Sequence, residues 1–378
     1  MIGRSTSNPV TFHLIEQLRD LEDFCLLADS CSAIAVDTEF VRESTYFPKF
    51  CLMQIALPGA IFCIDPLKIE SLEPLRLLLG KPHQTIIIHA SRQDLEVFHR
   101  QPGALPSQLK DTQIAAGLAG LQDQIGYAPL TREILGVSVN KEQTRTDWSK
   151  RPLTQEQFDY AANDVRHLLE ISERLESRLH DLGRRDWWIE DSTRLLDPTL
   201  YEPNSKLAWK RVSGIHILDP ESGARAMRLA QWREEAAMHL DLPRNWVLRD
   251  ESLIHFSRRP ELPDDAIRIR GVTQEAQRTW TLKLNDKLRE EPLDADVALF
   301  QMSAGQRPSP ERKAALKALG QCVQAQSKAL GIHPSLLASK RDLEEFMEKR
   351  PESRLTSGWR KAVIGDPLCL LLSDHRLD

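Results

Sequence analysis

Four acidic side chains in three short stretches have the types and spacing that metal-ion chemistry requires. Asp37 and Glu39 lie two positions apart near the end of an apolar stretch, residues 34–40. Because side chains alternate along a strand, both carboxylates project to one face, while Thr38 and Phe40 project to the other. Neighbouring carboxylates repel each other, and a divalent cation such as Mg²⁺, which prefers oxygen ligands, relieves that repulsion. The alternative is that the strand ends before the acids and leaves them in a solvated turn.

Two further acids follow in helical stretches. Asp94 lies five residues after His89, where an apolar run gives way to a helix, and ligands bind at such junctions in open α/β sheets. Asp164 follows Tyr160 by four positions, so the two side chains lie on one helix face. One alternative is that Asp94 is only a residue of the first helical turn, without a function in binding. The other is that Tyr160 and Asp164 lie on a solvent-exposed helix edge.

Taken together, the four carboxylates supply about the charge that balances two divalent cations. Two-metal sites, with ions ~3.5–4 Å apart, are typical of phosphodiester cleavage. One ion generates the nucleophile from water, and the other stabilises the leaving oxygen. A tyrosine beside such a site can hold the attacking water in line. The set therefore predicts hydrolysis without a covalent enzyme intermediate, and no nucleophilic Ser or Cys is expected.

The first half of the chain alternates strand-like and helix-like patterns, which predicts an α/β domain. Residues 50–57 and 60–64 flank Pro58-Gly59 and predict a hairpin, so the sheet begins antiparallel and continues through βα crossovers. A long helix over 155–182 opens with Thr154 as its N-cap. The remaining predicted strands are 10–15, 34–40 and 85–89, and the remaining helices are 18–28, 72–79, 92–100, 112–118 and 130–135.

The second half is mostly helical. Residues 191–210 are rich in turn signals and predict a linker, and 292–310 form a second break. Apolar positions on the two sides of that break match at a constant offset of ninety residues, which indicates two copies of one small helical bundle, unless helical spacing repeats here by itself. The matching positions are Leu240, Leu242, Val247, Leu253 and Phe256 with Leu330, Ile332, Leu337, Leu343 and Phe346.

Composition excludes several classes of protein. The chain has 378 residues, a net charge of −5, 41% hydrophobic and 28% charged residues, as in a soluble protein of two or three domains. No segment is basic enough to bind polyanions by charge alone. The six cysteines form no CxxC pair, the first nine residues have no apolar signal core, and the longest apolar runs are too short to span a bilayer. We therefore expect a cytoplasmic protein.

The acidic motifs resemble a known set. Val36-Asp37-Thr38-Glu39-Phe40, Asp94 after His89, and Tyr160 with Asp164 resemble the three exonuclease motifs of the DEDD superfamily, in its tyrosine-containing branch. The surrounding segments at 44–48, 145–148 and 151–153 resemble the ribonuclease D family, and the resemblance covers essentially the full length. It implies a ribonuclease H-like fold, with a mixed sheet and the Asp37 strand near its centre.

The resemblance also implies a domain order. Residues 1–190 form the 3′→5′ exonuclease domain, and 191–210 form the linker. Residues 211–292, with Gln231-Trp232-Arg233 and Leu242 to Val247, resemble an HRDC domain. Residues 293–378 are a second, divergent HRDC-like domain, with Leu336 in place of Trp246. These all-α bundles are expected to hold RNA, although a packing platform or a protein-binding module is the alternative for the first one.

Carried over residue by residue, the resemblance makes Asp37, Glu39, Asp94 and Asp164 ligands of two divalent metal ions, Mg²⁺ or Mn²⁺. Asp37 bridges the two ions, and Tyr160 orients the nucleophilic water. The expected substrate-binding residues are Thr38, Phe40, Arg42, Gln54, Arg145 and Trp148. For three of them there is an alternative: Arg42 is a surface arginine, Gln54 a strand-edge residue and Trp148 a packing residue.

The implied activity is that of a 3′→5′ exoribonuclease, which releases nucleoside 5′-monophosphates. Its expected substrates are RNAs with a free 3′ end, such as tRNA precursors and other structured RNAs, and no obligate protein partner is evident. A DNA 3′→5′ exonuclease uses the same constellation and is the alternative of the same class. A non-catalytic RNA-binding protein is the alternative of a different class, but all four carboxylates are present.

Overall fold

The structure is a computed structural model, and it describes residues 11–139, 146–259, 267–290, 293–304, 309–350 and 353–374. The chain forms two compact units. The first comprises Met1–Val41, Phe50–Tyr201 and Pro310–Asp378, and the second comprises Arg42–Lys49 and Glu202–Ser309. No helix in the described ranges has the length and apolar character to cross a membrane.

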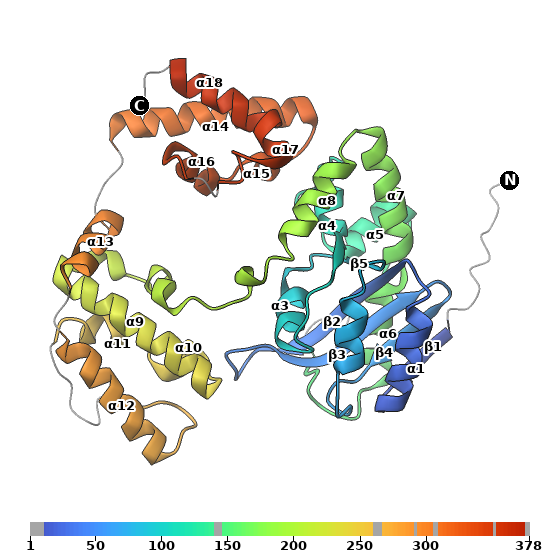
Figure 1. Ribbon diagram of the computed structural model, residues 1–378, viewed down its shortest axis with the longest axis horizontal. Helices are drawn as coiled ribbons and strands as arrows, with labels where there is room; N and C mark the ends of the chain where they lie inside the picture. The colour runs from blue at the N-terminus through green and yellow to red at the C-terminus, as the bar shows by residue number, and fades with distance from the viewer. Residues whose placement is uncertain are drawn as a thin grey trace. The chain divides into compact units, whose positions relative to one another are not determined.

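The first unit is built on a six-stranded mixed sheet with the strand order β1-β4-β3-β2-β5-β6 (Figure 1). β3 and β4 form the predicted antiparallel hairpin, whereas the pairs β1/β4, β2/β5 and β5/β6 are parallel. The strand that carries Asp37, β2, is therefore an interior strand. The strands are β1 (Thr11–Ile15), β2 (Ala33–Val41), β3 (Lys49–Leu57), β4 (Ala60–Ile64), β5 (Thr85–Ile88) and β6 (Gln108–Asp111).

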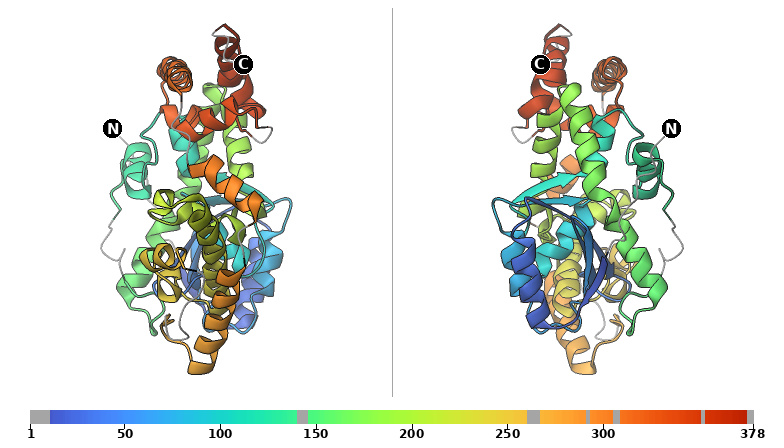
Figure 2. Two further views of the ribbon diagram at one scale, coloured as in Figure 1. Left: turned by 90° about the vertical axis from the view of Figure 1, so that its left-hand side faces the viewer. Right: turned by 90° about the vertical axis from the view of Figure 1, so that its right-hand side faces the viewer.

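Helices cover both faces of this sheet. On one face, α1 (Leu18–Ala28), α2 (Glu73–Leu79) and α3 (Arg92–Arg100) share one hydrophobic core with the sheet. On the other face, α6 (Gln155–Arg166) and α7 (Leu168–Asp181) pack against the sheet. Figure 2 shows the blue helices and the green helices on opposite sides of the strands. The predicted α/β class is confirmed.

The predicted helix over 155–182 is interrupted at His167, so that prediction was wrong in one respect. The backbone N–H of His167 donates to the Tyr127 hydroxyl at 3.2 Å instead of continuing the helical ladder. Tyr127 also begins α5 (Tyr127–Leu135), three residues before the predicted start. The elements that escaped prediction include β6, and α8 (Arg185–Arg194), whose last residues occupy the start of the predicted linker.

The C-terminal helices belong to the first unit and share a core with α4 (Thr112–Leu118), α7 and α8. The Trp187 and Trp359 rings stack with centroids 4.3 Å apart and planes at 6°. Arg360 is buried and forms an ion pair with Asp191. The C-terminal helices are α14 (Pro310–Leu330), α15 (Pro334–Leu337), α16 (Lys340–Met347), α17 (Gly358–Arg360) and α18 (Asp366–Asp374).

The second unit is a helical bundle around buried Trp232, Leu253 and Leu284. Trp209, from the short 3-10 helix η2 (Ser205–Arg211), and Phe300 also contribute to this core. The offset of ninety residues holds for three successive helices, because α9, α10 and α11 begin ninety residues before α14, α15 and α16. The main helices are α9 (Pro220–Leu240), α10 (Arg244–Val247), α11 (Asp250–Phe256), α12 (Gln274–Arg289) and α13 (Asp294–Ala304).

The connection between β2 and β3 also belongs to this second unit. The Tyr46 hydroxyl donates to Oε1 of buried Glu234 at 2.5 Å, and Arg244 pairs with the same carboxylate at 2.5 Å. The backbone N–H groups of Tyr46 and Phe47 both donate to Oδ1 of Asp241 at 3.0 Å. Burial would by itself raise the pKa of Glu234, but hydrogen bonds from Arg244 and Tyr46 hold it below its usual value. Glu234 therefore stays ionised and fixes the connection.

Candidate active site

Strand β2 delivers the first two acids to the α6 side of the sheet. Ile34 and Val36 lie in the core beneath α1 to α3, whereas Ala35 packs with Ala162 of α6. Side chains alternate along a strand, so Asp37 and Glu39 continue the row that Ala35 begins. The predicted division of the two faces is confirmed by this packing, and the strand runs on to Val41, which removes the alternative that it ends before the acids.

Helix α6 brings Asp164 to the same place, one turn after Tyr160. It begins with a capping box between Thr154 and Gln157, as the sequence predicts, and buries Ala161 and Ala162 against the sheet. These small side chains allow a close approach of helix and strand. Asp37, Glu39 and Asp164 each offer an oxygen atom, and these atoms lie within 4.8 Å of one another.

Asp94 reaches the cluster from the opposite side of β2. It lies in the first turn of α3, is 6% exposed, and accepts a hydrogen bond of 2.6 Å from the Thr38 hydroxyl. It is not one of the three acids within 4.8 Å, but its charge raises the pKa values of both Asp37 and Glu39. Asp94 therefore interacts electrostatically with the other acids of this group.

The turn that precedes Asp94 is fixed by a residue that sequence reasoning missed. The buried carboxylate of Asp111 accepts hydrogen bonds from the backbone N–H groups of Ala90 and Ser91, at 3.1 and 2.8 Å, and from the Ser91 hydroxyl at 2.8 Å. It also caps α4 through Gln113. The only sequence signal was an Asp before a helical stretch, which is common.

Burial dominates the electrostatics of the acids. It raises the pKa of Glu39 to about 9 and that of Asp94 to about 7, and the neighbouring carboxylates raise the pKa of Glu39 further. The pKa of Asp37 is also well above its usual value, from burial and from Asp94, Asp164 and Glu39. A group of carboxylates that are at least partly buried and repel one another is stabilised by positive charge. Its all-oxygen donor set fits hard divalent cations, so the fold and this cluster indicate divalent-metal use.

Tyr160 has a packing partner in Trp148. The Trp148 ring is 3% exposed, and its centroid lies 6.1 Å from that of Tyr160. Arg151 donates to the Trp148 carbonyl at 2.7 Å and forms an ion pair with buried Asp65 at 2.5 Å. Arg151 also donates to the Cys51 carbonyl at 2.6 Å. Asp65 was missed, because no local pattern pairs it with a residue 86 positions away.

The other predicted substrate contacts have different surroundings. Gln54 is fully buried, and neither polar atom of its side chain has a hydrogen-bond partner among the residues that the structure describes. Phe40 is partly buried and packs against the core beneath α1 to α3. The Arg42 Nε donates to the Tyr46 carbonyl at 3.2 Å. Arg145 lies outside the described residues.

His89 is a partly buried histidine with a hydrogen-bond partner for each ring nitrogen. Its ring nitrogens contact the Thr112 hydroxyl and the Ile125 carbonyl, each at 3.0 Å. Burial lowers its pKa, so the imidazole is neutral at physiological pH. Its hydrogen bonds help to hold the end of β5 against α4.

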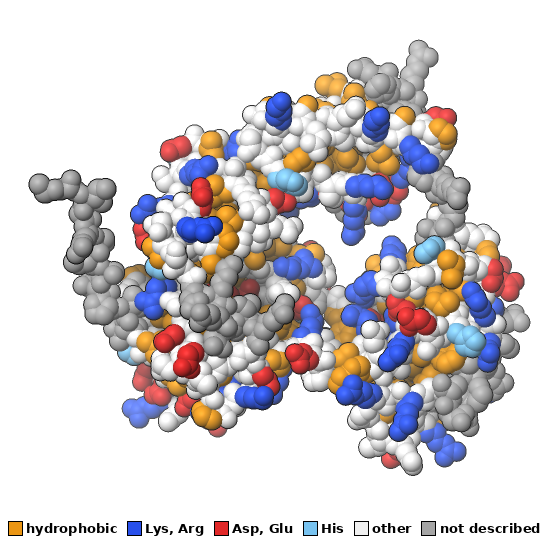
Figure 3. Space-filling view, turned by 180° about the vertical axis from the view of Figure 1, so that it is seen from behind, with side chains coloured by type: hydrophobic (Ala, Val, Ile, Leu, Met, Phe, Trp, Pro, Cys, Tyr) orange, Lys and Arg blue, Asp and Glu red, His pale blue; other side chains and the backbone are white. Residues whose placement is uncertain are grey.

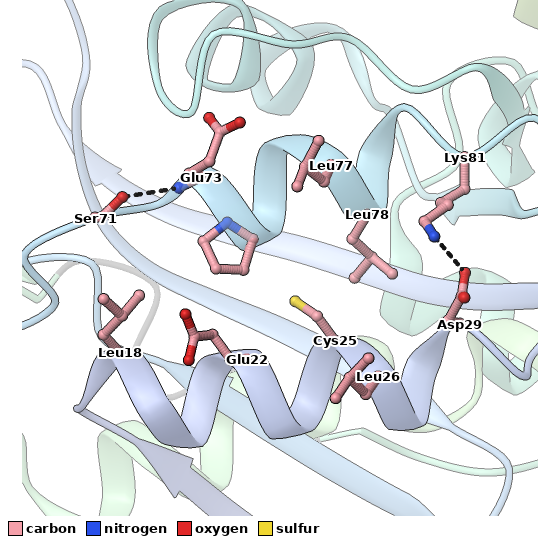
Figure 4. Close-up of a pocket in the computed structure, with 11 residues that line it drawn as sticks. Leu18, Glu22, Cys25, Leu26, Asp29, Ser71, Glu73, Leu77, Leu78 and Lys81 are labelled. Carbon is pink, nitrogen blue, oxygen red and sulfur yellow. Dashed lines mark hydrogen bonds and ion pairs between the residues drawn. The ribbon is translucent and has the colours of Figure 1, made fainter.

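A separate recess of about 520 Å³ lies between α1 and α2 (Figure 4). It contains none of the predicted site residues. Its apolar walls include Leu26 and Leu77, and Lys81 pairs with Asp29 at 3.0 Å at one end. Burial raises the pKa of Cys25 to about 12, so this thiol is protonated and unreactive. The recess is therefore not part of the acidic site.

Comparisons with known proteins agree with the fold described above. A family model described as 3′-5′ exonuclease matches residues 12–180, and an HRDC domain model matches residues 222–279. A ribonuclease D of Gluconacetobacter diazotrophicus is 37% identical over 356 residues, covering 91% of this chain and 88% of that protein. A ribonuclease D of Xanthomonas oryzae is 35% identical, covering 93% and 96%.

Solved structures give the same result. The crystal structure of Escherichia coli RNase D, an exoribonuclease involved in structured RNA processing, matches with a TM-score of 0.80 and 31% identity, covering 96% of this chain and 99% of that one. The catalytic core of RRP6 from Trypanosoma brucei shares the fold, with a TM-score of 0.58, 22% identity, and 74% and 79% coverage. The chain belongs to the ribonuclease D family and is a 3′→5′ exoribonuclease.

Proposed function

We propose that Asp37, Glu39, Asp94 and Asp164 bind two divalent cations, Mg²⁺ or Mn²⁺, and that the chain uses them to remove nucleoside 5′-monophosphates from RNA 3′ ends. The observation that carries this proposal is the convergence of three carboxylate oxygens within 4.8 Å, from β2 and α6. In this proposal Asp37 would help to hold both cations. When bound, the cations supply the positive charge that phosphodiester hydrolysis needs.

The protein's own groups then orient the reactants. Tyr160 lies one helical turn before Asp164, and its hydroxyl is proposed to hold the attacking water in line with the phosphorus. The Trp148 ring restricts the position of Tyr160 from one side. Thr38 orients the Asp94 carboxylate through its hydroxyl. Since water is the nucleophile, no covalent intermediate on a Ser or Cys forms.

For the terminal nucleotides we propose contacts on both faces of β2. The backbone at Thr38 and the ring of Phe40 flank the acids, and an aromatic ring can stack on a base. Arg42 and Arg145 are proposed to contact phosphates. Gln54 and Trp148 are buried, so we propose that they act from beneath the site, Trp148 by holding Tyr160 in place.

We propose tRNA precursors and other structured RNAs as substrates, in the cytoplasm, with no obligate protein partner. In the proposed domain organisation, residues 1–190 hydrolyse RNA. The linker at 191–210 joins them to the helical bundles at 211–292 and 293–378, which hold the RNA. The description of Escherichia coli RNase D as an enzyme of structured RNA processing supports the substrate class. The six free cysteines are compatible with a reducing compartment.

A gel time course on matched 5′-labelled single-stranded RNA and DNA tests the proposal, with Mg²⁺, with Mn²⁺ and with EDTA. We expect stepwise shortening of RNA from the 3′ end only when metal is present, and the Asp164→Asn variant should show none. Equal or faster digestion of DNA would instead indicate a DNA exonuclease. No digestion of either by metal-loaded protein would indicate an RNA-binding protein.

A further inference from the structure

Helices α1 and α2 carry leucines that the sheet beneath them does not cover. Leu21 of α1 and both Leu75 and Leu79 of α2 are buried in the core that these helices share with the sheet. Leu26 and Leu77 do not contribute to that core, and their side chains are 74% and 54% exposed. Single exposed leucines are common, but these two line one recess from opposite sides.

That recess, of about 520 Å³, lies between the two helices (Figure 4). The residues of each helix that line it are spaced by one, three or four positions, so each helix presents one stripe of side chains to the recess. It is called the α1–α2 recess below and is defined by six of its lining residues, Glu22, Cys25 and Leu26 of α1 and Glu73, Leu77 and Leu78 of α2.

The floor of the recess is apolar. Leu78 is buried, and the Cys25 thiol, whose pKa is raised to about 12, stays protonated and behaves as a small apolar side chain. After burial, the negative charge of Glu22 contributes most to raising that pKa. The Glu22 carboxylate therefore lies close to the apolar floor.

The rim of the recess is acidic. Three of its lining residues are acids and one is a base, Lys81, which pairs with Asp29 at 3.0 Å at one end. Figure 4 shows Glu22 and Glu73 on opposite walls, toward the other end. Glu73 forms an exposed ion pair with Arg76 at 2.5 Å, and such a pair exchanges partners at little cost. Among the described residues, the Glu22 carboxylate has no hydrogen-bond or ion-pair partner.

We propose that the α1–α2 recess is a docking site for an amphipathic helix of a partner protein, with an apolar stripe and with Lys or Arg at one end of that stripe. An apolar side chain of this helix enters between Leu26 and Leu77 and covers both. Its basic residue lies between Glu22 and Glu73. Helix α1 has 11 residues and is about 16 Å long, so about three turns of a partner helix match it.

The surroundings favour a protein helix over other occupants. The acidic rim repels RNA and anionic lipid surfaces. Lys and Arg side chains are frequent on the opposite side of the molecule, which Figure 3 shows, whereas α1 and α2 face the viewer in Figure 1. Neither wall is a strand, so an extended peptide finds no sheet edge to pair with. The exposed leucine walls also leave the recess too open to enclose a small apolar ligand.

Two fluorescent helical peptides and the full chain test the proposal, by fluorescence anisotropy. Both peptides have about 18 residues, long enough to form a helix, and the same leucine stripe. They differ only at the positions that flank the stripe, which are Lys in one peptide and Glu in the other. We expect the basic peptide to bind about tenfold more tightly or better, and the double variant Glu22→Lys/Glu73→Lys should invert that preference.

Adjacent residues of α1 provide matched controls. Leu26→Ser should weaken binding of the basic peptide about tenfold, whereas Leu27→Ser should not, because Leu27 is 53% exposed and lies outside the recess. Glu22→Lys should weaken it more than Asp23→Lys, which changes the charge equally at an exposed position outside the recess. Equal losses within both pairs would overturn the proposal in favour of unspecific attraction, and so would binding of neither peptide.

Sedimentation of the full chain separates a partner helix from a second copy of the chain. We expect Leu26→Ser to sediment as the unmodified protein does. Loss of a dimer in that variant would mean that a second copy covers the recess and would overturn the proposal. If Leu26→Ser lowers the melting temperature, the comparison of Glu22→Lys with Asp23→Lys still decides, because both positions are exposed.

This proposal and the proposed function fail separately. The recess contains none of the acids of the catalytic cluster, so RNA hydrolysis should be unchanged in each of these variants. The partner is accordingly not required for hydrolysis. The peptide assay contains no RNA and tests docking alone.

Discussion

The Thr38 hydroxyl donates a hydrogen bond of 2.6 Å to the Asp94 carboxylate, so the two motifs that carry the acids are joined directly, 56 residues apart. Thr38 lies between Asp37 and Glu39 in the sequence but on the other face of β2. One strand thus provides two acids on one side and orients a third from the other. This relationship makes Thr38 a positioning residue for Asp94 in the proposed metal site.

Removing that hydroxyl should weaken metal use. We expect Thr38→Val to raise the metal concentration for half-maximal hydrolysis, or to lower kcat, by about 10–100-fold, the usual effect of losing a hydrogen bond to a metal ligand. Thr38→Ser keeps the hydroxyl and should stay near the unmodified activity. Titration of the activity of each variant with Mg²⁺ and Mn²⁺ measures the half-maximal metal concentration and kcat. A Thr38→Val curve that overlays the unmodified one would exclude the role.

Removing one acid should abolish hydrolysis without unfolding the protein. In the absence of metal, Asp37→Ala or Asp164→Asn relieves repulsion among partly buried carboxylates, so the melting temperature in EDTA should stay equal or rise. Each kcal/mol of relieved repulsion corresponds to roughly 2–4 °C in a domain of this size. Melting curves with and without Mg²⁺ test this. Unmodified turnover in either variant would remove the acid from the site.

The metal-free protein should lose stability as pH rises. Folding raises the pKa of Glu39 from 4.5 to about 9 and that of Asp94 from 3.8 to about 7. The folded state therefore holds protons that the unfolded state releases between about pH 4 and pH 9, and stability falls across that window. Mg²⁺ should reduce the fall, because it binds the ionised acids. Melting temperatures from pH 5 to 9, with EDTA or Mg²⁺, check the sign, and a rise with pH in EDTA would contradict it.

Arg151 should matter for stability and activity together. Its side chain is 17% exposed and its partner Asp65 is 2% exposed. Arg151→Ala leaves that buried carboxylate unpaired, which costs about 3–5 kcal/mol of unfolding free energy. It also frees the segment that carries Trp148. Denaturant unfolding gives the value, and Arg174→Ala, which breaks an exposed pair with Glu170, is the control at about 1 kcal/mol or less.

Tyr160→Phe tests the proposed role of the hydroxyl. The ring still packs on Trp148, so folding and KM should change little. Loss of a group that orients or polarises water lowers kcat by about 10²-fold or more. Steady-state kinetics on single-stranded RNA separates the two constants. A large change in KM with kcat preserved would point to substrate contact instead.

Local patterns were sufficient for much of the fold. The strands and helices up to Arg100 were predictable from period and turn signals, and the acids of β2 and α6 from spacing. β6 was missed because Gln108-Leu109-Lys110-Asp111 is short and charged, as an edge strand often is. The break at His167 depends on the Tyr127 hydroxyl, forty residues away. A tertiary hydrogen bond does not change the helical spacing of apolar residues in the sequence, so the sequence pattern does not reveal it.

The same reason explains what was missing from the site. The pairs Thr38–Asp94 and Asp65–Arg151 are separated by 56 and 86 residues. Each residue alone is an ordinary strand, turn or loop residue. Gln54 was expected to contact the substrate or, alternatively, to be an edge residue of its strand, yet β3 lies between β2 and β4 and Gln54 is completely buried. Only the sheet order shows this.

The β2–β3 connection has a consequence for engineering. The chain passes between the two units at four points, after Val41, Lys49, Tyr201 and Ser309. The first HRDC bundle is therefore not a detachable module. Deleting residues 202–309 would strip Tyr46 of Glu234 and Arg244, and Tyr46 lies nine residues from Asp37. Truncation would confound loss of the bundle with damage to the catalytic strand, whereas surface point substitutions would not.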